Sequence, residues 1–214
     1  MNSSVKYQQT IEMPVQIKNI IKKSRFIATV KEVEKEDEIK QFLKEITQEF
    51  PDANHHCWAY QIGYTNRSLS HYSDGGEPAN SAGPPILQAI RKEMVTNVMV
   101  IVTRYFGGIK LGISGLIKAY RETALIGIQS AGKIKKYPLR EYIFENIDYQ
   151  VLGNIIQLIE SQSGRIEKID YREKVKIMVL LPDNLKEWLV SNLYNFSQGN
   201  IHINQGEIHW FSKK

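Results

Sequence analysis

The sequence has little of what several large classes of protein require. Cysteine occurs once, at Cys57, so no disulfide can form within the chain, which is typical of proteins from a reducing compartment. No apolar run approaches the roughly 20 residues of a membrane-spanning helix. The most apolar stretch, residues 98–102, is short and rich in β-branched side chains, and residues 1–10 lack the basic and apolar regions of a secretion signal. We therefore expect a cytoplasmic protein that has no association with membranes.

Acidic residues are scarcer than basic ones in the first part of the chain. Residues 1–136 hold 19 Lys and Arg against 13 Asp and Glu, a net charge of +6, whereas residues 137–214 hold 9 against 10, a net charge of −1. A basic region beside a nearly neutral one indicates a polyanionic partner for the basic region. The alternative is that the excess charge serves only solubility.

Hydrophobic periodicity predicts an α+β protein with two domains. In the first domain, strands are expected at residues 7–13, 15–30 (bent near residues 22–24), 55–62 and 96–104, and helices at 34–50, 85–94 and 114–130. In the second, the order strand, helix, strand, strand, helix, strand is expected at 141–148, 151–161, 166–171, 174–181, 185–196 and 208–211. This βαββαβ order is the ferredoxin-like arrangement. With residues 132–138 as a linker, the predicted domains are 1–134 and 138–214.

The first glycine-rich segment, residues 71–87, reads HYSDGGEPANSAGPPIL and runs into a predicted helix. So many glycines and prolines exclude regular structure throughout. Free N–H groups at the helix start, near Ser81 and Gly83, would form a concavity that binds anions. The alternative is a long tight turn in which Asp74 and Ser81 only cap the backbone.

The second glycine-rich segment, residues 103–120, reads TRYFGGIKLGISGLIKAY and leads from a buried strand into a helix. Its glycines include Gly107 and Gly108, and its cations are Arg104, Lys110 and Lys118. Cations and aromatic side chains around exposed backbone are what a phosphate or nucleobase site requires. The alternative is that the aromatic side chains belong to the core and the lysines are simply solvated.

Residues 55–57, His-His-Cys, give only a weak indication of metal binding. On a strand, His55 and Cys57 share one face while His56 points to the other. No second pair of Cys or His at zinc-binding spacing accompanies them. Asp74 and Glu77 could form an acid and base pair, but polar turns often carry such residues without catalysis. We therefore predict no metal, no cofactor and no catalytic residue.

Four segments together resemble the IMPACT/YigZ family: KKSRFIA (22–28), HHCWAYQIG (55–63), SDGGEPANSAGPPIL (73–87) and VTRYFGGIKLGISGLIKAY (102–120). The resemblance implies that the first domain has the ribosomal protein S5 domain 2-like fold, shared with one domain of elongation factor G. It implies that the second is the ferredoxin-like domain of bacterial members. The family usually has an acid at the position of Gly75 and a lysine at the position of Pro84. The replacement of that lysine by Pro84 removes a cation from the proposed anion site.

Eukaryotic relatives inhibit the activation of an amino-acid-starvation kinase through an additional N-terminal domain. Only residues 1–21 precede the first matching segment here. We therefore expect that domain, and the role in kinase regulation, to be missing.

The sequence thus favours a protein that binds RNA or the ribosome and regulates translation. One alternative is an enzyme acting on a small phosphorylated or carboxylated substrate, and another is an adaptor that binds a protein partner through the free sheet face of the second domain. The residues expected to bind the ligand are Arg25, His55, Asp74, Glu77, Ser81, Gly83, Arg104, Gly107, Gly108, Lys110 and Lys118.

Overall fold

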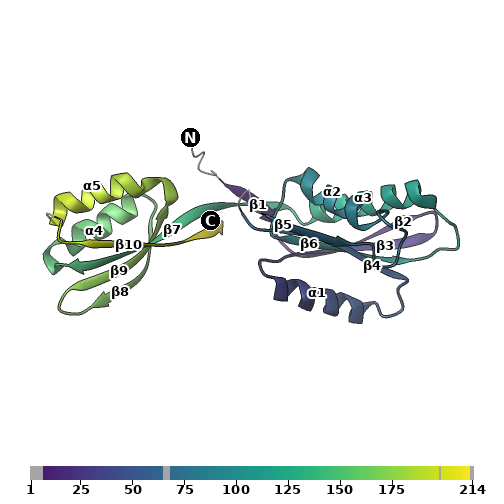
Figure 1. Ribbon diagram of the computed structural model, residues 1–214, viewed down its shortest axis with the longest axis horizontal. Coiled ribbons are helices and arrows are strands. Elements are labelled where there is room, and N and C mark those ends of the chain that lie inside the picture. The colour runs from purple at the N-terminus through teal and green to yellow at the C-terminus, as the bar shows by residue number, and fades with distance from the viewer. Residues whose placement is uncertain (1–6, 65–67, 198, 213–214) are drawn as a thin grey trace. The chain divides into compact units, whose positions relative to one another are not determined.

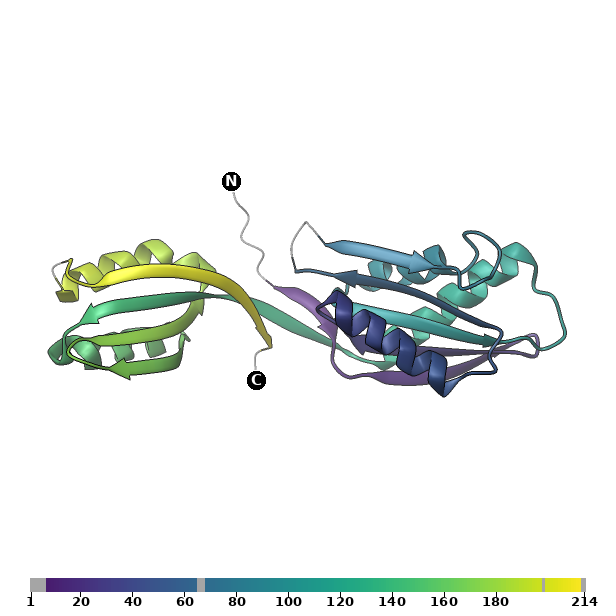
Figure 2. The same cartoon turned by 60° about the horizontal axis from the view of Figure 1, so that its bottom comes forward.

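A computed structural model describes residues 7–64, 68–197 and 199–212 (Figures 1 and 2). The chain divides into two compact units. One comprises Gln8–Lys135, and the other comprises the chain from Lys136 onward together with Tyr7. Among the described residues, no helix is both long and apolar enough to cross a membrane.

A five-stranded antiparallel sheet forms the middle of the first unit. Its strands, in spatial order, are β2 (Val15–Ile21), β3 (Ser24–Glu32), β6 (Val98–Tyr105), β4 (His55–Ile62) and β5 (Leu69–Ser73). Figure 2 shows β5 at one edge of this sheet and the β2–β3 hairpin at the other. The central strand, β6, is buried along almost its whole length, as its run of β-branched residues predicts.

Helices cover both faces of that sheet (Figure 1). Helix α1 (Glu36–Glu49) covers one face, while α2 (Gly83–Glu93) and α3 (Gly112–Ser130) cover the other. Because successive strand residues point to opposite faces, β6 supplies both apolar layers. Val100 and Val102 join the layer beneath α2 and α3, and Met99 and Ile101 join the layer beneath α1.

The second unit has the predicted ferredoxin-like arrangement. Its elements are β7 (Lys133–Ile147), α4 (Tyr149–Ser161), β8 (Arg165–Tyr171), β9 (Val175–Pro182), the short 3₁₀ turn η1 (Asp183–Leu185), α5 (Lys186–Ser197) and β10 (His202–Ser212). The antiparallel sheet has the order β10-β7-β9-β8. Helices α4 and α5 lie on the same face of it (Figure 1), where Phe144, Ile177 and Leu189 belong to one buried cluster.

Two expectations about loops are wrong. The predicted linker at residues 132–138 contains the boundary between the two units, but it is not a loop, because β7 begins at Lys133 and continues through it. At its start β7 pairs with β1 (Gln8–Ile11), so its backbone groups are satisfied in a sheet. The first glycine-rich segment also begins later than expected, because residues 71–73 belong to β5 and pair with β4.

Candidate functional site

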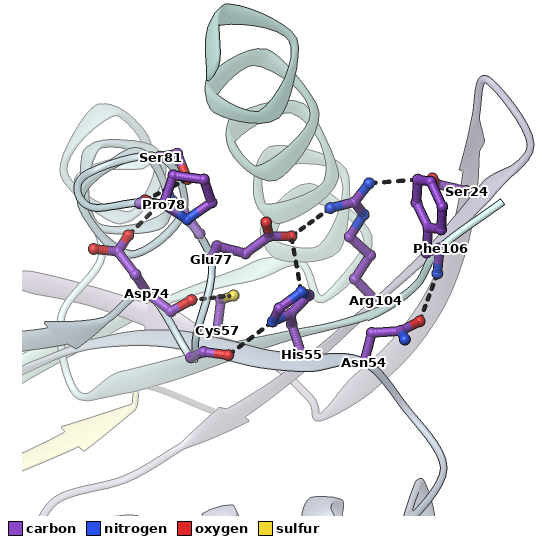
Figure 3. Close-up of polar contacts among 12 residues, drawn as sticks. Ser24, Asn54, His55, Cys57, Asp74, Glu77, Pro78, Ser81, Arg104 and Phe106 are labelled. Atoms are coloured by element: carbon purple, nitrogen blue, oxygen red, sulfur yellow. Dashed lines mark hydrogen bonds and ion pairs between the residues drawn. The ribbon is translucent and has the colours of Figure 1, made fainter. Parts of the chain in front are cut away.

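A buried carboxylate joins the first glycine-rich segment to the end of the sheet (Figure 3). Oε1 of Glu77 accepts hydrogen bonds from Nη1 of Arg104, at 2.6 Å, and from the hydroxyl of Tyr120 in α3, at 2.7 Å. Nε2 of His55 lies 3.9 Å from the same oxygen. The side chains of Glu77 and Arg104 are only 3% and 7% exposed. The structure therefore brings together three of the predicted site residues, from the loop, β6 and β4.

This cluster holds the loop in place. The charge of the Glu77 carboxylate is balanced by the buried guanidinium of Arg104, and its Oε1 also accepts a hydrogen bond from the hydroxyl of Tyr120. Burial raises the pKa of the Tyr120 hydroxyl well above its usual range, so that group remains a donor to Glu77. The ion pair of Glu77 with Arg104 fastens residues 74–82 to the end of β6.

The carboxylate of Asp74 caps the start of α2. Its Oδ1 accepts hydrogen bonds from the backbone N–H groups of Ala82 and Gly83, both at 2.9 Å, and its Oδ2 accepts one from Asn80 at 2.8 Å. The next two residues of α2 are prolines, which have no N–H group. The expectation of free N–H groups at this turn is therefore wrong, because a carboxylate of the chain itself already occupies it.

Ser81 has a local role in the same turn. Its hydroxyl is buried and donates to the carbonyl oxygen of Pro78, at 2.6 Å. Asp74 and Ser81 thus satisfy the backbone of a tight turn, which is the alternative that the sequence left open.

The residues around Cys57 are arranged for packing. Sγ of Cys57 donates to the carbonyl oxygen of Asp74, at 2.9 Å, and Nδ1 of His55 lies 3.0 Å from the carbonyl oxygen of Gly75. Burial raises the pKa of the Cys57 thiol to about 12, so the thiolate needed for nucleophilic attack is absent at neutral pH. Gly75 has a φ of +54°, and a Cβ atom there would lie 2.2 Å from the carbonyl oxygen of His56. The backbone here therefore leaves no room for a side chain at position 75.

His56 points to the other face of the sheet, as strand alternation predicts. Its Nδ1 lies 3.1 Å from Oγ1 of Thr103, and burial lowers the pKa of its imidazole. Within the described ranges, no three His, Cys, Asp or Glu side chains are grouped so that they could hold a metal ion.

The second glycine-rich segment packs against the hairpin between β2 and β3. The N–H of Gly107 donates to Oγ of Ser24 at 3.2 Å, and a Cβ atom on Gly107 would lie 2.0 Å from the carbonyl carbon of Lys23. Only glycine allows such a close approach of two backbones. The contact brings the exposed Lys22 and Lys23 to the loop that carries the exposed Lys110. We call the surface formed by residues 20–24 and 106–114 the basic edge.

The start of α3 lies in the basic edge. Among the residues that the structure describes, no side chain caps its first turn, and the turn itself contains no acidic residue. For the amide groups of residues 112–114, the described part of the chain provides no hydrogen-bond acceptor. Such amides, with the positive end of the helix dipole, favour an anion.

Acidic residues are missing from the two segments that form the basic edge. No Asp or Glu occurs between Glu12 and Glu32 or between Glu93 and Glu122. This pattern was the signal in the sequence that could have identified Lys22 and Lys23, which we did not predict as site residues. The other end of β3 differs, because a pocket of about 610 Å³ there has an acidic lining of Lys31, Glu32, Glu34, Asp37, Glu38 and Gln41.

Three of the four predicted cations lie outside the basic edge: Arg104 is buried in its pair with Glu77, and Arg25 and Lys118 lie elsewhere. Arg25 is opposite Tyr105 in the β3–β6 pairing, so its side chain projects from the face opposite to Arg104, and its Cζ lies 3.9 Å from the centre of the Tyr105 ring. Lys118 lies on the exposed side of α3 and forms an ion pair with Glu122 at 3.8 Å. Gly108 belongs to the basic edge and has open space around it.

The sheet face of the second unit carries charges of both signs. A pocket of about 430 Å³ is lined by Glu145, Lys168, Asp170, Arg172, Lys176 and Met178. Lys176 pairs with Glu145 at 2.7 Å, and Arg172 pairs with Asp170 at 3.0 Å. Four of the five charged side chains that line this pocket are therefore paired with one another.

Comparisons with known proteins agree with this structure. The family model of the Impact N-terminal domain matches residues 22–128. IMPACT family member YigZ of Escherichia coli is 35% identical, over 89% of this chain and 93% of its own. IMPACT family member YvyE of Bacillus subtilis is 32% identical, over 91% of this chain and 88% of its own. A crystal structure described as that of a hypothetical protein, 32% identical, superposes with a TM-score of 0.70 and covers 94% of this chain and 97% of its own. The predicted fold, an S5 domain 2-like unit followed by a ferredoxin-like unit, is confirmed.

Proposed function

Because this chain belongs to the IMPACT family, we propose that it is a cytoplasmic RNA-binding protein that acts on or near the ribosome and regulates translation. The observation that carries this proposal is the basic edge. There, the uncapped first turn of α3 lies in a surface that exposes Lys22, Lys23 and Lys110 and whose two segments contain no acidic residue.

The backbone amides and the lysines of the basic edge both suit a phosphate group. The amides of residues 112–114 offer N–H donors at the start of α3, and the helix dipole adds partial positive charge. The lysines add full charges that displace condensed counterions when they meet a nucleic-acid backbone. Most contacts between proteins and nucleic acids are of this kind, because phosphate contacts position the chain.

Replacing the lysines of the basic edge tests the proposal. In the variant with Lys22, Lys23 and Lys110 changed to Ala, we expect weaker binding to RNA and a salt dependence whose slope falls by about 2, since each lost phosphate contact removes roughly 0.7. Fluorescence anisotropy across a series of salt concentrations measures both. Arg104 is left unchanged, because it is buried in the pair with Glu77 and its loss would disturb the fold.

The matched control removes the same charge elsewhere in the same unit. Lys40, Lys44 and Lys92 are also exposed and lie on α1 and α2, away from the basic edge. Changing these three to Ala should leave the slope unchanged if the site is local. If the variant of the basic edge binds RNA with the affinity and slope of the wild type at every salt concentration, the proposal is wrong.

The ribosomal part of the proposal has its own test. Affinity capture of the tagged protein from a cell lysate should recover ribosomal particles, and treatment with RNase should abolish that recovery. Recovery that persists after RNase would indicate a protein partner instead, as predicted for the free sheet face of the second unit.

A further inference from the structure

Phe106 is the most prominent aromatic side chain of the basic edge. It is 47% exposed and directly follows β6. An exposed phenylalanine contributes nothing to phosphate binding, so attraction between lysines and a polyanion does not account for it. The same edge exposes Ile109 and Ile113, which are 41% and 61% accessible. The basic edge is therefore apolar as well as cationic.

The structure holds Phe106 in a fixed position. Its backbone N–H donates to Oδ1 of Asn54, at 2.7 Å. Its ring lies against the guanidinium of Arg104, whose Cζ is 5.6 Å from the ring centre (Figure 3). Arg104 is itself fixed by Glu77 and is 7% exposed. A ring supported in this way loses little freedom when it binds a ligand.

From this geometry we infer that the basic edge takes single-stranded RNA and that an unpaired base stacks on Phe106. The guanidinium of Arg104 lies over one side of the Phe106 ring, and the exposed part of the ring is left for a base. Stacking on aromatic side chains beside a basic surface is how proteins hold unpaired bases. A duplex keeps its bases stacked inside and presents mainly phosphate and ribose, so it would leave Phe106 uncovered.

This inference rests on the proposed function, and one set of measurements separates the two. The probes are a short labelled oligouridine, which has no stable secondary structure, and an RNA duplex of the same length. Wild-type protein should bind the oligouridine more tightly than the duplex. Phe106→Ala should weaken oligouridine binding between about 5-fold and about 150-fold, leaving duplex binding and the salt slope unchanged. Phe106→Trp should keep the affinity, since indole also stacks.

Tyr72 offers a matched control. It is an aromatic residue of the same unit with the same exposed fraction, 47%, but it lies on the edge strand β5, away from the basic edge. Tyr72→Ala should leave the binding of both probes unchanged.

The outcomes are distinguishable. If Phe106→Ala binds the oligouridine like wild type while the lysine variant binds weakly, the stacking inference is overturned and the proposed function remains. If wild type binds the duplex as tightly as the oligouridine, stacking is overturned in the same way. If wild type binds neither probe, the proposed function fails, and this inference fails with it.

Discussion

Two glycine-rich turns lead into two helices of the same unit, and they differ in what happens to their N–H groups. At α2, Asp74 accepts from the amides of Ala82 and Gly83, and two prolines remove the next two donors. At α3, no side chain in the described part of the chain caps the first turn, and no acid lies in that turn. One turn is therefore closed by the chain itself, and the other presents its amides to solvent.

This difference shows that a glycine-rich entry to a helix is not by itself a site for anions. What decides is where each backbone donor finds its acceptor. The closed turn carries Glu77, which fixes Arg104, and Arg104 supports the ring of Phe106. The first segment thus supports Arg104 and Phe106, and the second carries the surface that we propose to contact RNA.

The largest loss of stability is expected from breaking the ion pair between Glu77 and Arg104. Glu77→Ala leaves the guanidinium of Arg104 buried without its carboxylate, which should lower the free energy of unfolding by about 3–5 kcal/mol. Urea unfolding measures the loss. Glu122→Ala is the control, because it removes the partner of the exposed Lys118 and should change stability by less than about 0.5 kcal/mol. Equal losses in the two variants would mean that the buried pair does not hold the loop.

A smaller loss of stability is expected from removing the carboxylate that caps the start of α2. Asp74→Ala removes the acceptor of three backbone N–H groups and should lower the free energy of unfolding by about 1–3 kcal/mol. Hydrogen exchange should become faster at Asn80, Ala82 and Gly83, while exchange at the start of α3 stays as it was. Unchanged exchange at those three amides would contradict the assignment of Asp74 as the cap.

Much of this fold follows from local sequence. Strand β4 has the predicted bounds, 55–62, because a short apolar run with aromatic side chains favours a strand. Helix α1 falls inside the predicted helix because its apolar residues recur at helical spacing. The βαββαβ order of the second unit was readable for the same reason. The strand at the start of β7 was missed, since its lysines suggest a solvated linker. It becomes regular through pairing with two distant strands, β1 and, from Lys136 onward, β10.

The site was less predictable because it depends on contacts between distant residues. The approach of Gly107 to Lys23 requires β3 to lie beside β6, which no local pattern reveals. Arg25 was predicted to bind the ligand together with Arg104, but the register that pairs it with Tyr105 places the two side chains on opposite faces of the sheet. The role of Asp74 depends on the path of the loop back to α2, so the sequence could not choose between a cap and an anion site.

The smallest change in stability is expected from making the open turn resemble the closed one. Ser114 is exposed in the first turn of α3, where a carboxylate would complement the helix dipole. Ser114→Asp should therefore raise the free energy of unfolding by about 0.3–1 kcal/mol. The same carboxylate would compete with phosphate for the amides and repel it, so RNA affinity should fall by roughly fivefold or more, the equivalent of about 1 kcal/mol.

These opposite signs make the variant informative, because a damaged fold cannot produce both. Thermal unfolding and fluorescence anisotropy with RNA, on the same preparation, measure the two effects. Ser114→Asn has nearly the same shape without the charge, and it should keep the affinity of the wild type. If Ser114→Asp and Ser114→Asn bind RNA equally well, no phosphate approaches the first turn of α3, and the open turn differs from the closed one only in its hydration.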